Sequence, residues 1–215
     1  MLHSCKVNTE HKNKVKRALD LFCGGGGAGV GLYDAGFEVV GVDIDPQPRY
    51  PFEFVQADAL KFDLSGFDFV WASPVCKRFS SATVTSKTSK KWPDQIGQIR
   101  KKLKQWGGDW AIENVAGAPL IDPVILCGAM FGLELYRHRF VETSRKIAQP
   151  AHPEHKNPVC KMGRPPKPGE FINPVGHFSG VPAAQRAMGI DWLGQKELAQ
   201  AVPPAYAEYV AKQFT

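Results

Sequence analysis

The feature that most restricts the fold is a strand, a glycine-rich turn, a helix and a second strand in direct succession. An apolar run ends at Phe22 and is followed by the glycines of 24–29. Residues 30–35 have helical spacing, and Gly36 is a typical C-terminal cap. Residues 38–43 then form an apolar strand pattern. Because parallel strands need a crossover connection, this succession predicts one βαβ unit.

The same alternation continues along the rest of the chain. Further strands are predicted at 54–58, 67–72, 109–115 and 139–142, and helices at 94–106, 183–192 and 197–213. Strands that alternate with helices predict an α/β fold with a mostly parallel sheet and helices on both faces. No repeat of fixed period is visible.

A proline-rich segment at 143–178 interrupts this pattern. Its prolines exclude long regular elements, so the segment is predicted to be an insertion built of loops. The domain division that follows is a catalytic domain of 1–142 and 179–215 with a short inserted segment of 143–178. The prolines are Pro150, Pro153, Pro158, Pro165, Pro166, Pro168 and Pro174.

Composition limits the class of protein. With 43% apolar and 22% charged residues, the chain can bury a core. No apolar run reaches transmembrane length, and the first residues lack the apolar stretch of a signal peptide. The five cysteines have no paired spacing, which favours a reducing compartment, so a cytoplasmic location is expected. His152, His155 and Cys160 match no strong zinc spacing, and no metal is expected.

The charge balance indicates a polyanionic partner. The net charge is +6, and the basic residues gather in 11–17, 77–104 and 145–167. Each cluster by itself is also compatible with an ordinary solvated surface. Because the middle cluster begins beside a candidate nucleophile, nucleic acid is the expected partner.

That candidate nucleophile is Cys76, which follows the buried strand pattern and a turn at Pro74. A lone cysteine is commonly a small buried apolar residue. Here the adjacent Lys77 and Arg78 are expected to favour the reactive thiolate. The polar and basic residues of 80–91 are predicted to form a loop that closes over a charged partner.

Polar residues follow several predicted strands where those strands end. Asp43, Asp58, Cys76 and Glu113 all lie at or just beyond such ends. In open α/β sheets the ligand crevice lies outside the carboxyl ends of the strands. We therefore expect these four side chains to meet at one edge of the sheet.

The glycine turn satisfies G-x-G-x-x-G from Gly24 to Gly29, and Asp43 follows about 20 residues later. Glycines let the backbone approach a ligand closely, and a carboxylate at a strand end accepts hydrogen bonds from ribose hydroxyls. The pattern predicts an adenosine-containing cofactor, with Asp58 placed to accept from an adenine amino group. A glycine turn without a ligand is the alternative.

Short stretches along nearly the whole chain resemble, in order, the motifs of the cytosine-C5 methyltransferases, which use S-adenosylmethionine. Each stretch is short enough to occur by chance, but their shared order makes the resemblance specific. The stretches are Asp20–Gly27, Asp43–Asp45, Pro74 with Cys76, Phe79 and Ser80, Glu113–Val115, Arg137–Arg139 and Ala199–Pro204.

The resemblance implies a Rossmann-like class I methyltransferase fold and transfer of a methyl group from S-adenosylmethionine to C5 of a cytosine flipped out of duplex DNA, with S-adenosylhomocysteine as product. It implies Cys76 as nucleophile, Glu113 as acid, and Arg139 with support from Arg137 at the base. The implied cofactor residues are Phe22, Gly24, Gly26, Gly27, Asp43, Ile44, Asp58, Pro74, Gln200 and Val202. The implied substrate and DNA residues are Lys77, Arg78, Ser80, Ser81, Lys87, Lys90, Lys91 and Asn114.

The chain departs from the family pattern in several places. Val75 stands in place of a proline, Lys77 in place of a glutamine, and Gln200 in place of an asparagine. Only 143–178 fills the place of a target-recognition domain, as in the short members found in bacteriophage genomes. A partner protein could therefore supply specificity. The same chemistry on RNA or a free nucleotide, an inactive DNA-binding derivative and a dinucleotide-dependent oxidoreductase are the alternatives.

Overall fold

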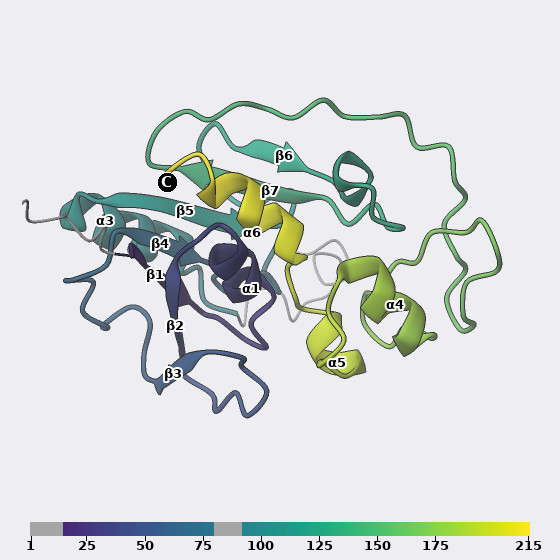
Figure 1. Cartoon of the computed structure of the whole chain (residues 1–215), viewed down its shortest axis with the longest axis horizontal. Helices are drawn as coiled ribbons and strands as arrows, with labels where there is room; N and C mark the ends of the chain where they lie inside the picture. The colour runs from purple at the N-terminus through teal and green to yellow at the C-terminus, as the bar shows by residue number, and fades with distance from the viewer. Residues whose placement is uncertain (1–14, 80–91) are drawn as a thin grey trace, which may run out of the picture.

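The computed structural model describes residues 15–79 and 92–215, and the strands within them form one twisted sheet (Figure 1). The strands are β1 (Arg17–Leu21), β2 (Glu38–Asp43), β3 (Glu53–Gln56), β4 (Phe69–Ala72), β5 (Asp109–Asn114), β6 (Val124–Leu126) and β7 (Arg139–Thr143). Their spatial order is β3-β2-β1-β4-β5-β7-β6. The pairs from β3 to β5 are parallel, whereas β7 runs antiparallel to both β5 and β6.

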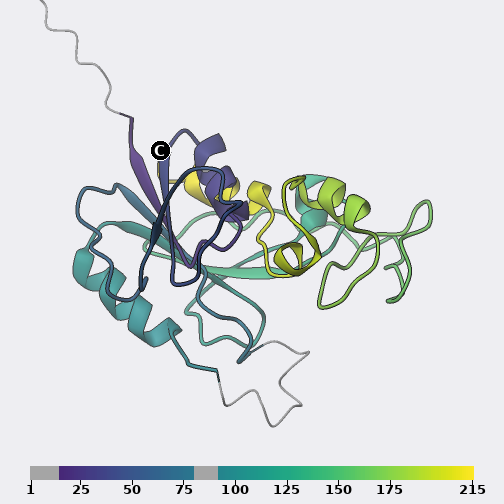
Figure 2. The same cartoon turned by 90° about the horizontal axis from the view of Figure 1, so that it is seen from below.

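Helices cover both faces of this sheet. They are α1 (Gly27–Asp34), α3 (Ile96–Trp106), α4 (Val181–Met188), α5 (Gln195–Leu198), α6 (Pro204–Ala211) and the 3₁₀ helix η2 (Gly128–Phe131). Leu32 of α1 and Tyr206 of α6 belong to one buried cluster, and Ile99 and Leu103 of α3 belong to another. Figure 2 accordingly shows α1 and α6 on one side of the sheet and α3 on the other. The predicted α/β fold with a mostly parallel sheet is confirmed.

A close backbone approach joins α1 to the chain that leads into α6. A Cβ atom at Gly27 would lie 2.2 Å from the carbonyl oxygen of Val202, so only glycine allows this contact. The helix α6 then begins at Pro204, where a missing N–H is tolerated in the first turn. The glycine turn and the late part of the chain therefore form one packed unit.

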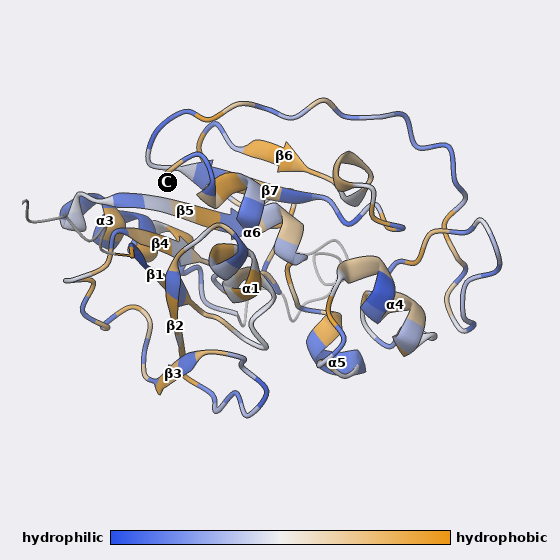
Figure 3. Ribbon diagram, in the orientation of Figure 1, coloured by the Kyte–Doolittle hydropathy of each residue, from blue (hydrophilic) through white to orange (hydrophobic). Residues whose placement is uncertain are grey.

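The long connection between β7 and α4 contains no helix or strand among its residues, apart from an isolated bridge between Val159 and Phe171. It is attached to the domain through Ile172 and Phe178, which pack in a third buried cluster with α4. Figure 3 shows mostly hydrophilic residues along this connection, with hydrophobic residues interspersed. In the described part of the chain no helix has the length and apolar character needed to cross a membrane.

The structure differs from the predicted elements in two places. The predicted helix of 197–213 is divided into α5 and α6, because Pro203 and Pro204 cannot continue a helix. The short strand β6 was not predicted, and it forms the edge of the sheet beside β7.

Candidate active site

The carboxyl ends of β1, β2, β4 and β5 open into one cavity of about 360 Å³. Asp43, Asp58, Cys76 and Glu113 all line it, which confirms that they meet at one edge of the sheet. The other predicted site residues that line it are Phe22, Gly24, Gly27, Ile44, Pro74, Lys77, Arg139, Gln200 and Val202. The adenosine end and the nucleophile end of the predicted site therefore share a single cavity.

The turn after β1 takes an unusual backbone conformation. Phe22 lies in the left-handed region with a φ of 57°, and Gly26 follows with a φ of 86°. This backbone conformation of Phe22 is strained for an aromatic residue and is typical of functional turns. The indole Nε1 of Trp192 donates to the carbonyl of Gly25 at 2.8 Å and fixes the outer side of the turn.

The Asp43 carboxylate is held at the end of β2 by two backbone amides. The N–H of Gly24 donates to Oδ2 and that of Asp45 donates to Oδ1, each at 3.0 Å. At the end of the next strand, Oδ1 of Asp58 accepts from the N–H of Leu60 at 3.0 Å. Both carboxylates are thereby oriented toward the cavity with acceptor capacity left for a ligand.

Asp20 is a site residue that was not predicted individually. It is completely buried, lines the cavity, and its Oδ1 has no hydrogen-bond partner within the described structure. Burial raises the pKa of Asp20 well above its ordinary value, although hydrogen bonds from the Tyr50 hydroxyl and the Gly29 amide lower this pKa in part. A buried acceptor without a partner needs an explanation, and a cationic or N–H-bearing ligand in the cavity would supply one.

Cys76 lies in the loop after β4, and hydrogen bonds to two carbonyls of this loop hold it in place. The buried amide of Asn114 donates from Nδ2 to the carbonyl of Pro74 at 2.9 Å, and the N–H of Phe79 donates to the carbonyl of Cys76 at 2.9 Å. Asn114 does not line the cavity, so it positions the loop. Asn114 was predicted among the substrate residues, with orientation of the turn after the strand as the other interpretation, and its hydrogen bond to Pro74 supports the second.

The expected cause of Cys76 ionisation was wrong. Burial raises the pKa of the Cys76 thiol, and Glu113 raises it further. The cations that lower this pKa are Arg139 and Arg137, not the sequence neighbours Lys77 and Arg78. Within that loop, Lys77 lies with its Nζ 4.3 Å from the centre of the Trp92 ring.

Glu113 and Arg139 form a nearly buried ion pair across β5 and β7. The Arg139 Nε lies 2.8 Å from the Glu113 Oε1, and the two side chains are 11% and 7% exposed. Burial raises the pKa of Glu113, while Arg139, the Ser73 hydroxyl and Arg137 lower it in part. Ser73 lines the cavity and was not predicted. The pair places an acid and a cation beside the cysteine.

Arg137 has a different environment. Its Nε, Nη1 and Nη2 donate to the carbonyls of Ala201, Pro174 and Ala199 at 3.0, 2.9 and 2.8 Å. Burial and the nearby Arg139 lower the pKa of Arg137 to about 9, so it remains charged at neutral pH. It does not line the cavity and fixes the wall formed by 199–202. Its predicted role, support for Arg139 at the base, is corrected to that of a positioning residue.

Other predicted residues lie elsewhere. Gly26 and Arg78 do not line the cavity, and Arg78 donates to the carbonyl of Trp92 at 3.1 Å. Trp92 and Gln95 do line it and were not predicted, because neither is part of a recognisable motif. The remaining predicted DNA contacts fall outside the residues that the structure describes, namely Ser80, Ser81, Lys87, Lys90 and Lys91.

The strand order, with β7 antiparallel between β5 and β6, is that of the class I methyltransferase fold. No protein-family model and no curated protein matches the sequence. Among solved structures, a putative prophage-encoded DNA modification methyltransferase from E. coli is similar with a TM-score of 0.64 and 15% identity, covering 92% of this chain and 97% of that one. The S. pombe Dnmt2 methyltransferase has a TM-score of 0.61 and 13% identity, with 94% and 98% covered. The Entamoeba histolytica methyltransferase EhMeth has a TM-score of 0.58 and 12% identity, with the same coverage. At these identities the likeness establishes the fold.

Proposed function

We propose that this chain is a methyltransferase that uses S-adenosylmethionine to methylate C5 of cytosine in DNA through a covalent adduct with Cys76. The observation that carries the proposal is that one cavity joins the glycine turn and its carboxylates to Cys76 and the Glu113–Arg139 pair. The similarity of the fold to a prophage DNA modification methyltransferase favours DNA as the substrate.

The residues at the adenosine end fit S-adenosylmethionine. Asp43 can accept from the ribose hydroxyls, Asp58 from the adenine amino group, and Phe22 and Ile44 can contact the apolar parts. The unpartnered Oδ1 of Asp20 suits the positive charge that this cofactor carries. When bound, S-adenosylmethionine supplies the electrophilic methyl group.

Cys76 would attack C6 of the cytosine ring. Its thiol must first lose its proton, which burial disfavours and the charge of Arg139 assists. Formation of the bond between sulfur and C6 moves electron density onto C5 and makes that carbon nucleophilic. After C5 takes up the methyl group, N3 would return its proton to Glu113 and a base, for which water would serve, would remove the C5 proton. The sulfur then leaves C6 as the thiolate, and the ring regains its double bond.

Glu113 would act as the acid that favours the adduct. Attack at C6 places negative charge on the ring, and a proton delivered to N3 neutralises it. The raised pKa of Glu113 increases the fraction of carboxyl that carries a proton at neutral pH. Arg139, which pairs with Glu113, would stabilise the charge at the cytosine O2.

A cytosine in duplex DNA cannot reach such a cavity, so the target base would be flipped out of the stack. The net charge of +6 suits a polyanionic substrate. The segment of 143–178 would contact the target, and 1–142 with 179–215 would form the catalytic domain. Because this segment is short, a partner protein would supply further sequence specificity.

The test is to incubate the protein with tritiated S-adenosylmethionine and separate pools of duplex DNA, single-stranded DNA, tRNA and dCTP, and then to identify the labelled nucleoside. We expect 5-methylcytosine in duplex DNA. Cys76→Ser should abolish transfer while cofactor binding, measured by calorimetry, is kept, and Cys160→Ser is the matched control that keeps both. Label only in another pool would refute DNA as the substrate, and unchanged transfer by Cys76→Ser would refute the covalent mechanism.

A further inference from the structure

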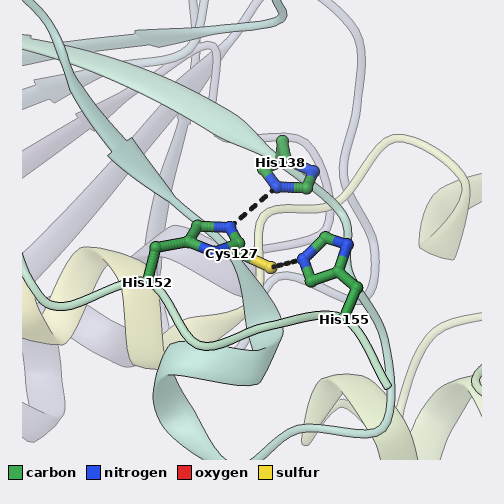
Figure 4. Close-up of side chains that lie close together, drawn as sticks. All are labelled: Cys127, His138, His152 and His155. Atoms are coloured by element: carbon green, nitrogen blue, oxygen red, sulfur yellow. Dashed lines mark hydrogen bonds between the residues drawn. The ribbon is translucent and has the colours of Figure 1, made fainter. Parts of the chain in front are cut away.

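One cysteine and three histidines from separate segments meet beside the β6–β7 edge of the sheet (Figure 4). Cys127 directly follows β6, His138 directly precedes β7, and His152 and His155 belong to the long connection toward α4. Their candidate ligand atoms all lie within 4.8 Å of one another. None of the four lines the cavity of the candidate active site.

The side chains point their donor atoms at one another. The Cys127 Sγ lies 3.3 Å from the His155 Nε2, and the His138 Nε2 lies 3.1 Å from the His152 Nε2. The His152 Nδ1 lies 2.8 Å from the carbonyl oxygen of Pro153. Because a carbonyl only accepts, Nδ1 carries the proton in the neutral ring, and the Nε2 lone pair faces the cluster. A backbone carbonyl bound to the second ring nitrogen is typical of histidines that ligate metals.

His155 is also held in place. Its ring stacks on that of Tyr136, with centroids 3.6 Å apart and an interplanar angle of 14°. The Tyr136 hydroxyl donates to the carbonyl of Asn157 and accepts from the N–H of Asn157, both at 2.9 Å. Asn157, two residues beyond His155, is thus hydrogen-bonded to Tyr136, the residue on which the His155 ring stacks. The orientation of His155 toward Cys127 is built into the fold.

We propose that Cys127, His138, His152 and His155 bind one Zn²⁺ ion. A thiolate with imidazoles suits zinc better than Mg²⁺ or Ca²⁺, which prefer oxygen ligands. With metal–sulfur and metal–nitrogen distances of about 2.3 and 2.0–2.1 Å, the ligand atoms of a tetrahedral site lie roughly 3.3–3.6 Å apart. The observed separations of 3.1 and 3.3 Å and the limit of 4.8 Å place an ion within reach of all four through small ring rotations.

Four protein ligands make a closed site, so the ion would be structural. It would link the β6–β7 edge to a connection that has only an isolated bridge for regular structure. His138 also connects the site to the cavity, because its carbonyl accepts from Nη1 of Arg139 at 2.9 Å. The ion would therefore fix the backbone from which Arg139 extends. The proposal is independent of methyl transfer.

The sequence-based expectation of no metal came from the spacing of His152, His155 and Cys160, which matches no strong zinc pattern. Cys160 lies elsewhere, with its Sγ 3.2 and 3.3 Å from the carbonyl oxygens of Lys161 and Arg164. The cysteine in the cluster is Cys127, which the fold brings to His155 from a distant segment. Spacing along the chain could not indicate this pairing.

The first experiment measures metal content in the full chain, prepared without an affinity tag, grown with zinc and dialysed against metal-free buffer. Elemental analysis by mass spectrometry should find about one zinc per chain, as for a closed structural site. His152→Ala should reduce zinc to less than a tenth of that value. His177→Ala is the matched control, because His177 is an exposed histidine outside the cluster, and it should keep the full content.

The second experiment replaces zinc by Co²⁺ and records the absorption spectrum. We expect the charge-transfer band of a thiolate–cobalt bond and the strong visible bands of tetrahedral Co²⁺. Cys127→Ser should lose the charge-transfer band and Cys160→Ser should keep it. Cys127 is buried, so its variant can fail to fold. Two variants of exposed residues, His152→Ala and His155→Ala, therefore provide a second test, and each should weaken the tetrahedral bands.

Several results would overturn the proposal. These are wild-type protein with no more zinc than His152→Ala, a charge-transfer band that persists in a folded Cys127→Ser, or a band that is lost in Cys160→Ser. Stoichiometric copper or iron in place of zinc would overturn the identity of the ion.

Discussion

The ion pair between Arg139 and Glu113 allows a quantitative prediction about stability. In Arg139→Met, the Glu113 carboxylate would remain buried without its nearest partner. Removing one member of a buried pair costs about 3–5 kcal/mol, and the remaining charge of Arg137 favours the lower end of that range. We therefore expect Arg139→Met to lower the free energy of unfolding by about 3 kcal/mol at pH 8.

The loss of stability in Arg139→Met should depend on pH, because the buried Glu113 carboxyl can take up a proton. In the wild type the pKa of Glu113 is already raised in the folded state. The folded protein then binds more protons than the unfolded one between the two pKa values, and stability falls as pH rises through that window. Without Arg139 the folded pKa is higher still, so the decline extends to higher pH. In the added interval the variant should lose about 1.4 kcal/mol per pH unit relative to the wild type.

The assay is urea unfolding at pH 6, 7 and 8, followed by tryptophan fluorescence, for the wild type, Arg139→Met, Glu113→Gln and the double variant. The neutral amide needs no counter-ion, so Glu113→Gln should recover most of the loss in the double variant. A coupling of about 2 kcal/mol or more at pH 8 is expected. A loss that is equal at pH 6 and pH 8, or a coupling below about 0.5 kcal/mol, would refute the argument that an uncompensated buried charge is the cause.

Three further changes test the cavity and its supports. Gly27→Ala places a Cβ 2.2 Å from the Val202 carbonyl oxygen and should cost about 1–3 kcal/mol in urea unfolding. Asp43→Asn should weaken binding of S-adenosylmethionine roughly tenfold to a hundredfold in calorimetry, because a charged acceptor is lost. Asn114→Ala leaves the Pro74 carbonyl without its side-chain donor and should cost about 1–3 kcal/mol, with a lower transfer rate at an unchanged cofactor Kd.

The controls for these changes come from the same chain. A Cβ at Gly97 in α3 meets open space, so Gly97→Ala should be neutral or slightly stabilising. A Gly27→Ala protein as stable as the wild type would contradict the close approach to Val202. Unchanged cofactor affinity in Asp43→Asn would remove this carboxylate from the cofactor site, and a raised Kd in Asn114→Ala would contradict its placement under the nucleophile loop alone.

Most of the sheet could be predicted because six of its strands have four to six residues with apolar residues at their centres. The strand β6 has only three residues, and its apolar run is too short to be distinguished from other buried segments by pattern alone. Residues at strand ends could also be placed, because the crevice of an open parallel sheet is set by topology. The sequence therefore predicts where Asp43, Cys76 and Glu113 meet.

What the sequence could not provide were roles that depend on distant contacts. Arg137 and Arg139 have the same side chain two positions apart, and only the carbonyls of Ala199 and Ala201 distinguish the positioning residue from the one that faces the cavity. In the same way, the ionisation of Cys76 depends on cations from another strand, so its sequence neighbours were misleading.

The hydrogen bonds from Arg137 to the wall of 199–202 have a consequence for cofactor binding. Each hydrogen bond from a charged donor contributes about 1.5–3 kcal/mol, so the two that Arg137 donates to the carbonyls of Ala199 and Ala201 would hold this wall in its binding geometry before a cofactor arrives. A preformed wall spares the complex the conformational entropy of ordering a loop. Differences in affinity among adenosine ligands should then arise from contacts inside the cavity, and calorimetry should record them mainly as enthalpy.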